Sequence, residues 1–363
     1  MIFLAGPRQS GKTTLSQELL SDSTGLYLNF DDPDHRKLIL QRAWNDEQKI
    51  VILDEIHKYS RWKNFVKGTY DTQGKIHQFV ITGSAKLDIY RHGQDSLLGR
   101  YFHWRLHPFC LAELKARNPK LNLLATLEQL SEHSGFPEPF LQNNSQFTAR
   151  WRKMRQTLIF REDIRDLEQI KDITLLEQFR DAIAQRAGQL LVLSNIARDL
   201  EIAPKTANAW LQVLERSFVL FTIKPFTRKL NRAILKPPKA YFFDMGEGQN
   251  DEGNRFENLV ALHLLKRLHY LEDSEGRKLS LHYVRDKEGH EVDFLIAEAE
   301  KPVMMIEVKL KPEHPSSLIY FSKKLKIKNS ILLVKEGTKK THTDYITYNA
   351  AEFLSQNLDA KLW

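Results

Sequence analysis

A turn enclosed by two glycines, close to the N-terminus, constrains the fold of this chain more than any other feature. Gly6 and Gly11 are separated by four residues, and Lys12 and Thr13 follow directly. An apolar run precedes the turn, and a segment with leucines at helical spacing follows it. Strand, glycine-bounded loop and helix in this order form the P-loop arrangement, in which backbone N–H groups surround phosphates at a helix N-terminus. The pattern predicts an α/β domain that binds a nucleotide.

The residues of this loop have separate expected roles. Lys12 is expected to reach the β- and γ-phosphates of ATP, and Thr13 is expected to ligate Mg²⁺. Gly6, Gly11 and Thr14 complete the predicted phosphate-binding set. ATP and Mg²⁺ are therefore the cofactors that the sequence predicts.

A second strand that ends in an acid is required by this arrangement, and the chain supplies one. Four apolar residues at 50–53 lead directly into Asp54 and Glu55. We expect Asp54 to coordinate Mg²⁺ through water and Glu55 to polarise the water that attacks the γ-phosphate. The alternative is that the two acids only cap the helix that follows them.

Two further candidates for catalysis follow along the chain. Ser84 comes just after a third apolar run at 79–81, where a small polar side chain at a strand tip could sense the γ-phosphate or the lytic water. Arg100 lies just ahead of a fourth apolar strand at 101–106. If Arg100 enters the site of a neighbouring subunit, it would stabilise transition-state charge, and the chain would act as a homo-oligomer. The alternative is that Arg100 pairs with a carboxylate of its own subunit.

Length and composition place the chain among folded proteins with several domains. It has 363 residues, of which 42% are hydrophobic and 28% are charged. A single cysteine, Cys110, excludes an intramolecular disulfide and every paired-cysteine zinc or redox motif. The apolar run Met1–Ala5 is far shorter than a signal peptide core or the ~20 residues of a membrane span. We therefore expect a cytoplasmic protein with no membrane partner.

The basic surplus of the chain lies in its middle. The net charge is +8, and residues 150–240 hold 18 basic and 10 acidic residues, so the flanking parts together are neutral. Six of the basic residues lie between Phe218 and Ala240, where there is no acid. This distribution favours contacts with the phosphates of nucleic acid, DNA in particular. A basic solvated surface, or a docking surface for a protein, is the alternative.

The same region has the pattern of a helix-turn-helix followed by a wing. Two short helices are expected on either side of a tight turn near Pro204, and an apolar strand at 218–223 follows them. Trp210 lies on the apolar face of the second helix and is expected in the core. The outward face and the loop after the strand carry polar and basic side chains: Lys205, Thr206, Asn208, Gln212, Arg228, Lys229, Arg232 and Lys236.

The last third of the chain has the element order of a nuclease-like core. A helix at 254–268 is followed by strands at 279–285, 291–296 and 302–310, then by a helical stretch and a strand at 331–334. The candidate ligands of one or two Mg²⁺ ions in this part are Glu257, Asp293, Glu307 and Lys309. The period of two places the last two on one face of a strand. A structural cluster of ion pairs in an inert domain is the alternative.

These motifs resemble those of AAA+ ATPases. The segments GPRQSGKTTL, LDEIHKYSRW, ITGSAKLD and SLLGRYFHWRLHPFCLAEL are similar to one prokaryotic AAA+ family whose C-terminal half is a region of unknown function. The resemblance implies a winged helix and a PD-(D/E)xK nuclease-like domain after the ATPase, with Ser84 as a sensor and Arg100 as the finger. It also implies that the four candidate ligands of the last third are the nuclease-like positions.

That family normally carries a helical segment ahead of the first strand, whereas Met1 already lies in the strand here. We therefore expect a truncated or misassigned start and an incomplete adenine pocket. A lid-side sensor arginine is not assigned, and Arg152, Arg155 and Arg161 are available for that role.

Together these observations predict an α/β chain of four parts. They are a P-loop AAA+ core with a mainly parallel sheet at 1–110, a reduced lid with linker helices at 111–165, a winged helix-turn-helix at 166–243, and a mixed α/β nuclease-like domain at 250–363. The predicted function is an Mg²⁺-dependent ATPase that couples ATP binding and hydrolysis to engagement of nucleic acid. A slow nucleotide-gated switch and an ATP-gated, metal-dependent nuclease are the alternatives.

Overall fold

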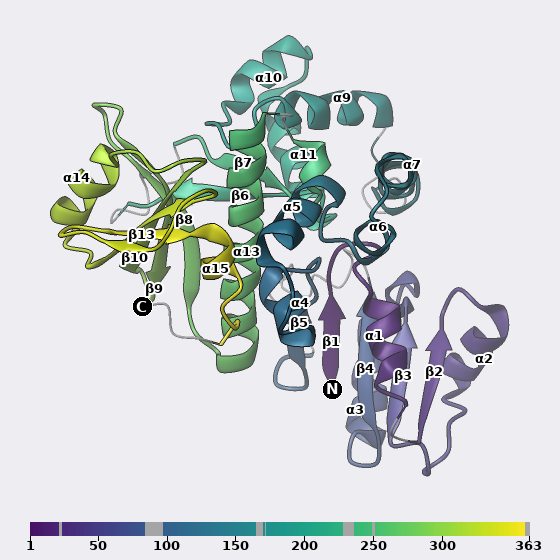
Figure 1. The fold of residues 1–363 in the computed structure, drawn as a ribbon. Coiled ribbons are helices and arrows are strands. Elements are labelled where there is room, and N and C mark those ends of the chain that lie inside the picture. Colours follow the sequence, from purple (N-terminus) through teal and green to yellow (C-terminus); the bar gives the residue numbers. More distant parts are fainter. Residues whose placement is uncertain are drawn as a thin grey trace. The chain divides into compact units, whose positions relative to one another are not determined.

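The computed structural model of the chain describes residues 1–21, 24–83, 97–164, 170, 172–227, 236–248 and 251–359. The chain forms two compact units (Figure 1). The first comprises residues 1–107 with 216–218, and the second comprises 108–215 with 219–363. Each unit is described separately below.

The first unit is built on a five-stranded parallel sheet in the order β2-β3-β4-β1-β5. Its strands are β1 (Ile2–Ala5), β2 (Gly25–Asn29), β3 (Ile50–Asp54), β4 (Gln78–Gly83) and β5 (Phe102–Arg105). The predicted parallel sheet is confirmed, and β2 is an additional strand at its edge. Because β3 and β4 are interior strands, their continuous apolar runs are buried on both faces.

Helices cover this sheet and complete its core. They are α1 (Lys12–Glu18), α2 (Pro33–Gln41), the short η1 (Ile56–Lys58) and α3 (Trp62–Gln73). Asp32 caps α2 by accepting hydrogen bonds from the backbone N–H groups of Asp34 and His35, both at 2.9 Å. Trp62 and Val66 of α3 pack with Phe3 in the buried core of the unit.

The second unit opens with a run of short helices. These are α4 (Leu111–Arg117), α5 (Leu123–His133), α6 (Pro137–Gln142), α7 (Ser145–Leu158) and the π-helical turn η4 (Ile159–Ile164). Two arginines of α7 are paired within this unit. Arg152 Nε donates to Asp244 at 2.7 Å, and a guanidinium nitrogen of the buried Arg155 lies 3.2 Å from Glu247. Two of the three arginines considered for the lid-side role, Arg152 and Arg155, therefore hold ion pairs of the second unit.

Three helices and two strands follow, in the order expected for the helix-turn-helix segment. They are α9 (Ile173–Ala184), α10 (Leu193–Asp199), α11 (Pro204–Arg216), β6 (Leu220–Pro225) and β7 (Lys239–Phe242). Trp210 of α11 is buried, as expected, and contacts Phe179 edge-on at 5.7 Å between ring centres. Lys205, Asn208 and Gln212 are exposed on the opposite face of α11. The predicted basic residues Arg228, Lys229 and Arg232 lie outside the described residues.

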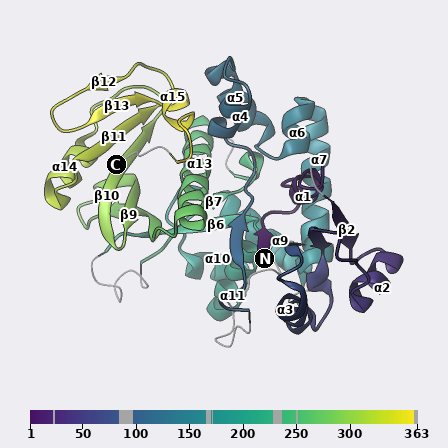
Figure 2. The ribbon, with the colours of Figure 1, turned by 90° about the horizontal axis from the view of Figure 1, so that it is seen from below.

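The C-terminal elements form a mixed sheet that is continuous with these two strands. Its order is β12-β13-β11-β10-β9-β8-β6-β7, where β6 joins β8 through the parallel pair Lys224–His282. The remaining elements are α13 (Glu252–Glu275), β8 (Leu279–Arg285), β9 (Glu291–Glu298), β10 (Lys301–Lys309), α14 (Ser316–Leu325), β11 (Asn329–Val334), β12 (Lys340–Thr341), β13 (Ile346–Asn349) and α15 (Ala350–Leu354). The predicted helix and four strands of this part are confirmed. Helices α13 and α14 lie on opposite sides of the sheet (Figure 2).

Candidate nucleotide-binding site

The loop between β1 and α1 has the backbone conformation that a phosphate cradle needs. Gly11 has a φ of 94°, a left-handed conformation that favours glycine, and Gln9 has a φ of 65°. At Gly6 the backbone of the neighbouring strand passes so close that an added Cβ would lie 2.2 Å from the carbonyl oxygen of Leu106. Both glycines of the sequence pattern are therefore required by the shape of the loop.

The side chain of Lys12 is folded back onto this loop. Its Nζ donates hydrogen bonds to the carbonyl oxygens of Gly6 at 3.0 Å and Pro7 at 2.7 Å, and the residue is buried. Two buried side-chain oxygens in the same loop, Gln9 Oε1 and Ser10 Oγ, have no hydrogen-bond partner among the described residues. A buried polar atom without a partner is costly, so these atoms indicate a loop that is shaped for a polar ligand.

Asp54 is the carboxylate on which three strands converge. Thr13 Oγ1 donates to Asp54 Oδ2 at 3.0 Å, and the Tyr27 hydroxyl donates to the same oxygen at 2.5 Å. Thr82 at the end of β4 donates to the other oxygen, Oδ1. The parallel pairing places Thr82 directly opposite Asp54 and places Tyr27 two residues before Asn29, the partner of Asp54 on β2. Thr13 comes from the first turn of α1. Burial and the neighbouring carboxylate raise the pKa of Tyr27 well above its ordinary value.

Glu55 lies beside this cluster in a strained backbone conformation. Its φ of 57° is left-handed, which is uncommon for a residue with a side chain and recurs at active sites. Burial raises the pKa of its carboxyl group. Lys58 Nζ lies 3.4 Å from Glu55 Oε2 and also contacts Asp31 at 2.5 Å, while His57 Nε2 lies 3.6 Å from the same Glu55 oxygen. These contacts hold one Glu55 oxygen in place.

The oxygen atoms at this edge of the sheet fit a magnesium ion. Mg²⁺ prefers carboxylate and hydroxyl oxygens together with water and phosphate. Thr13 and Asp54 supply such atoms 3.0 Å apart, next to the phosphate-type loop. The donor set is therefore compatible with the metal that the sequence predicts.

The remaining predicted residues of this site are Thr14, Ser84 and Arg100. Thr14 is exposed on α1, and Ser84 lies outside the described residues. Arg100 pairs with Asp71, with Nε to Oδ1 at 2.6 Å, and its side chain is 32% exposed. The structure thus shows the local carboxylate pairing that was the alternative for Arg100, and its role in a neighbouring site stays a prediction.

Asp293 links the four candidate ligands of the last third. Its Oδ2 accepts a hydrogen bond at 2.8 Å from the N–H of Val308, the residue between Glu307 and Lys309. Lys309 Nζ lies 3.7 Å from Glu307 and 2.9 Å from Glu313. Glu257 and Asp293 also lie around Lys239, a residue that the sequence analysis counted only as part of the basic wing. Among the residues that the structure describes, no group of three or more His, Cys, Asp or Glu is placed to hold a metal ion.

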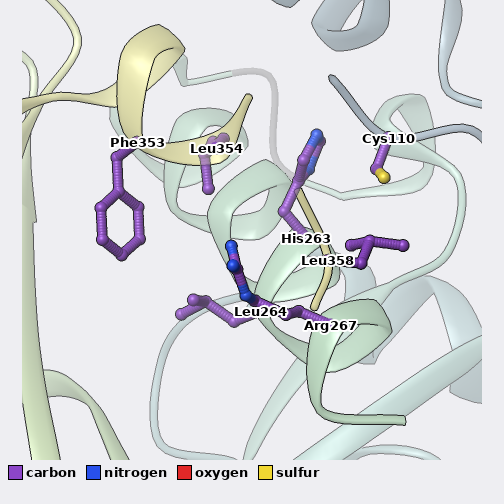
Figure 3. A pocket seen from close by; sticks show the side chains of 7 residues that line it. All are labelled: Cys110, His263, Leu264, Arg267, Phe353, Leu354 and Leu358. Atoms are coloured by element: carbon purple, nitrogen blue, oxygen red, sulfur yellow. The ribbon is translucent and has the colours of Figure 1, made fainter. Parts of the chain in front are cut away.

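A small pocket of the second unit lies beside α13, between Cys110, His263, Arg267 and the C-terminal segment (Figure 3). Burial raises the pKa of the Cys110 thiol to about 11 and lowers the pKa of His263 to about 4. The neutral imidazole accepts a hydrogen bond from the Leu111 N–H at 3.1 Å through Nε2, and its Nδ1 lies 2.8 Å from the Leu259 carbonyl oxygen. These groups join α4 to α13, and the protonated thiol is a poor nucleophile.

Sequence reasoning missed two of the partners of Asp54. Tyr27 was missed because its strand was not predicted, and Thr82 was not singled out in the segment that leads from the apolar run at 79–81 to Ser84. The signal for Tyr27 is weak, since β2 is a half-exposed edge strand with a short apolar pattern. Edge strands lack the continuous apolar runs that identify β3 and β4.

We expect the Tyr27→Phe variant to unfold more easily than the wild type. The substitution removes a hydrogen bond to a carboxylate, so the free energy of unfolding should fall by about 1–2 kcal/mol. Urea denaturation of both proteins measures the difference. Tyr59→Phe is the control, because no hydrogen bond of its hydroxyl is found among the described residues. A Tyr27→Phe protein as stable as the Tyr59→Phe protein would show that the contact contributes nothing.

Comparison with known proteins assigns a family description to the first unit only. A family model described as an AAA domain matches residues 1–115. Two domains of unknown function, DUF8612 and DUF4143, match residues 124–248 and 252–353. In the described residues, no helix is both long and apolar enough to cross a membrane.

Related proteins are themselves uncharacterized. Proteins of Mycobacterium bovis and Mycobacterium tuberculosis are each 24% identical over 302 residues, which cover 77% of this chain and 67% of theirs. A protein of Methanocaldococcus jannaschii is 24% identical over 405 aligned positions, with 93% of this chain and 81% of that protein covered.

Among solved structures, a signal transduction ATPase with numerous domains from Pyrococcus horikoshii, which carries a tetratricopeptide repeat sensor, is 12% identical to this chain. That match covers 76% of this chain, which spans 45% of the other protein's length, and its TM-score of 0.20 is too low to support an argument. The match to the AAA domain, together with the loop and acid geometry, indicates that residues 1–115 resemble a nucleotide-hydrolysing ATPase domain.

Proposed function

We propose that the chain is an Mg²⁺-dependent ATPase that couples ATP binding and hydrolysis to engagement of nucleic acid, with DNA favoured. The observation that carries the first half of this proposal is the juxtaposition of the P-loop with Asp54 and Glu55. Thr13, directly after Lys12, lies within hydrogen-bond distance of Asp54, although 41 residues separate them in sequence. Few functions other than nucleotide binding require this combination of loop and acid.

In this mechanism each residue has one task. The backbone N–H groups of the loop and Lys12 bind the phosphates, and release of Lys12 from the Gly6 and Pro7 carbonyl oxygens frees its charge for them. Thr13 and Asp54 hold Mg²⁺, which when bound neutralises charge on the β- and γ-phosphates. Glu55 accepts a hydrogen bond from the attacking water and orients it.

The proposal for nucleic acid rests on the helix-turn-helix segment. Helix α11 has a buried apolar face, and its exposed face carries Lys205, Asn208 and Gln212, which can donate hydrogen bonds to phosphates or bases. The strands β6 and β7 pair antiparallel and lie on either side of the basic stretch in sequence. Lys239 is one of the six basic residues of that stretch but is buried, so it does not contribute to such a surface.

We expect the Arg228→Ala, Lys229→Ala double variant to bind duplex DNA more weakly and with a flatter salt dependence. Loss of two phosphate contacts should lower the slope of log K against log salt by up to ~2. Fluorescence anisotropy across a salt series measures it. The matched control, Lys323→Ala with Lys324→Ala, removes two lysines whose side chains are 65% and 49% exposed on α14. An unaltered slope in the first variant would instead favour a protein partner.

Measuring ATP turnover with and without DNA distinguishes an ATPase that works on nucleic acid from a nucleotide-gated switch. An ATPase that works on nucleic acid should be stimulated by DNA, whereas a nucleotide-gated switch should bind ATP tightly and hydrolyse it slowly under both conditions. A panel of single-stranded and duplex DNA and RNA identifies the preferred partner.

Self-assembly through Arg100 is a further part of the proposal, and an Arg100→Ala subunit mixed with a Glu55→Gln subunit tests it by complementation.

A further inference from the structure

A lysine lies at the centre of the acidic cluster of the second unit. Lys239 is the first residue of β7, and its side chain is 3% exposed. Its Nζ lies 2.7 Å from Glu291 Oε1, 3.3 Å from Glu257 Oε1 and 3.8 Å from Asp293 Oδ1. Three carboxylates, one from α13 and two from β9, thus surround one ammonium group.

The ammonium group of Lys239 is chemically complementary to the carboxylates around it. An ammonium group has three N–H donors and no acceptor. Glu291 and Glu257 lie within hydrogen-bond distance of Nζ, whereas Asp293, at 3.8 Å, contributes its charge. Burial alone lowers the pKa of Lys239, but the carboxylates of Glu257, Asp293 and Glu291 outweigh it and raise the pKa above its ordinary value. A buried charge that is paired in this way is stable, whereas an unpaired one is costly.

Two of these three acids are residues that the sequence analysis expected to bind metal. Glu257 and Asp293 face Lys239, whereas the predicted lysine, Lys309, pairs with Glu307 and Glu313. Asp293 also lies beside the other two expected residues, because its Oδ2 accepts a hydrogen bond from the Val308 N–H at 2.8 Å. A cation therefore already lies where two members of the expected set, Glu257 and Asp293, meet.

We propose that the ammonium group of Lys239 is the resident cation of this carboxylate cluster and takes the place that a divalent metal ion would need. A second cation at the same oxygens would be repelled by the ammonium charge and would have to displace a group that already contacts Glu257 and Glu291. The nuclease-like part of the chain consequently binds no Mg²⁺ at Glu257 and Asp293 and cleaves no phosphodiester there.

In this arrangement the cluster joins parts of the second unit instead of performing chemistry. Lys239 is the first residue of β7, and Tyr241 on the same strand donates to Glu257 Oε1 at 2.7 Å. Asn258 of α13 accepts from the Phe242 N–H at 2.7 Å and donates to its carbonyl oxygen at 2.9 Å. Strand β7, which follows the basic loop, is therefore held against α13 by charge and by hydrogen bonds (Figure 1).

Mn²⁺ binding to the nucleotide-free full-length chain tests this proposal. The parent carries Asp54→Asn, which removes the candidate metal ligand of the first unit, and free Mn²⁺ is measured by electron paramagnetic resonance. Lys239→Ala is added to the parent to vacate the cluster. Lys309→Ala is the matched control, because it removes the lysine that the sequence predicted at a nuclease-like site, and the Nζ of that lysine pairs with Glu307 and Glu313.

We expect the parent and the Lys309→Ala variant to show no Mn²⁺ binding that depends on Asp293. Lys239→Ala should bind Mn²⁺ at least about tenfold more tightly than the parent, a difference of about 1.4 kcal/mol, and Asp293→Asn should abolish that gain. A folded Lys239→Ala protein without any gain would overturn the proposal. If Lys239→Ala does not fold, the parent alone decides: Mn²⁺ binding that is lost on Asp293→Asn contradicts the proposal, and binding that Asp293→Asn leaves unchanged supports it.

Discussion

The Glu55→Gln variant should lose ATP turnover by about 100-fold or more while it retains ATP binding, because general acid–base groups contribute roughly 10²–10⁴-fold to such reactions. Glutamine preserves the size of the side chain but cannot carry the negative charge that polarises water. The phosphate-binding loop and Asp54 are unchanged in this variant, so the affinity for ATP should stay near that of the wild type. Steady-state turnover and equilibrium ATP binding measure the two quantities separately.

The pH dependence of turnover gives a second readout of the same residue. Glu55 acts only in its ionised form, and burial raises its pKa above the ordinary value of 4.5. As the pH falls through this raised pKa, the carboxylate becomes protonated and turnover should decrease, beginning at a higher pH than for an exposed glutamate. Glu18→Gln, a change of an exposed acid on α1, is the control and should keep both rate and profile. Unchanged turnover in Glu55→Gln would remove this residue from the mechanism.

Local sequence patterns predicted the loop and the acids that the structure brings together in the first unit, because both are encoded in short segments. The loop from Gly6 to Thr13 and the acids after β3 are recognisable from adjacent residues alone. The edge strand β2 was not predicted, since its side chains are only partly buried and give no clear period. Because β2 was not predicted, Tyr27 was missed as well. Its hydroxyl is the nearest to Asp54 apart from that of Thr82.

The second unit shows which features of the fold local sequence patterns do not predict. The strands β8, β9 and β10 were located correctly, although β9 and β10 are buried on both faces over much of their length. Which strands become neighbours depends on long-range pairing, so the continuity of β6 with β8 was not predicted. The same limit applies to Lys239. Its charge suggested a basic surface, yet the fold places it among acids from α13 and β9, which lie more than fifteen residues away in sequence.

Lys12 should be the residue on which nucleotide binding depends most. Its Nζ donates hydrogen bonds to the loop carbonyl groups of Gly6 and Pro7, and a phosphate would replace these two neutral acceptors with charged ones. Hydrogen bonds between charged partners are roughly twice as strong as neutral ones. Lys12→Ala should therefore weaken ATP binding by about 100-fold or more, or about 2.7 kcal/mol. Lys37→Ala, which removes an exposed lysine of the same unit, is the control.

The central claim is tested most directly by titrating ATP with Mg²⁺ into the wild-type chain and into Lys12→Ala, with circular dichroism spectra to establish that both proteins are folded. The account predicts saturable binding to the wild type and a loss of about 100-fold or more in Lys12→Ala. A folded wild-type protein that binds no ATP, or a Lys12→Ala protein that binds it equally well, would contradict the account.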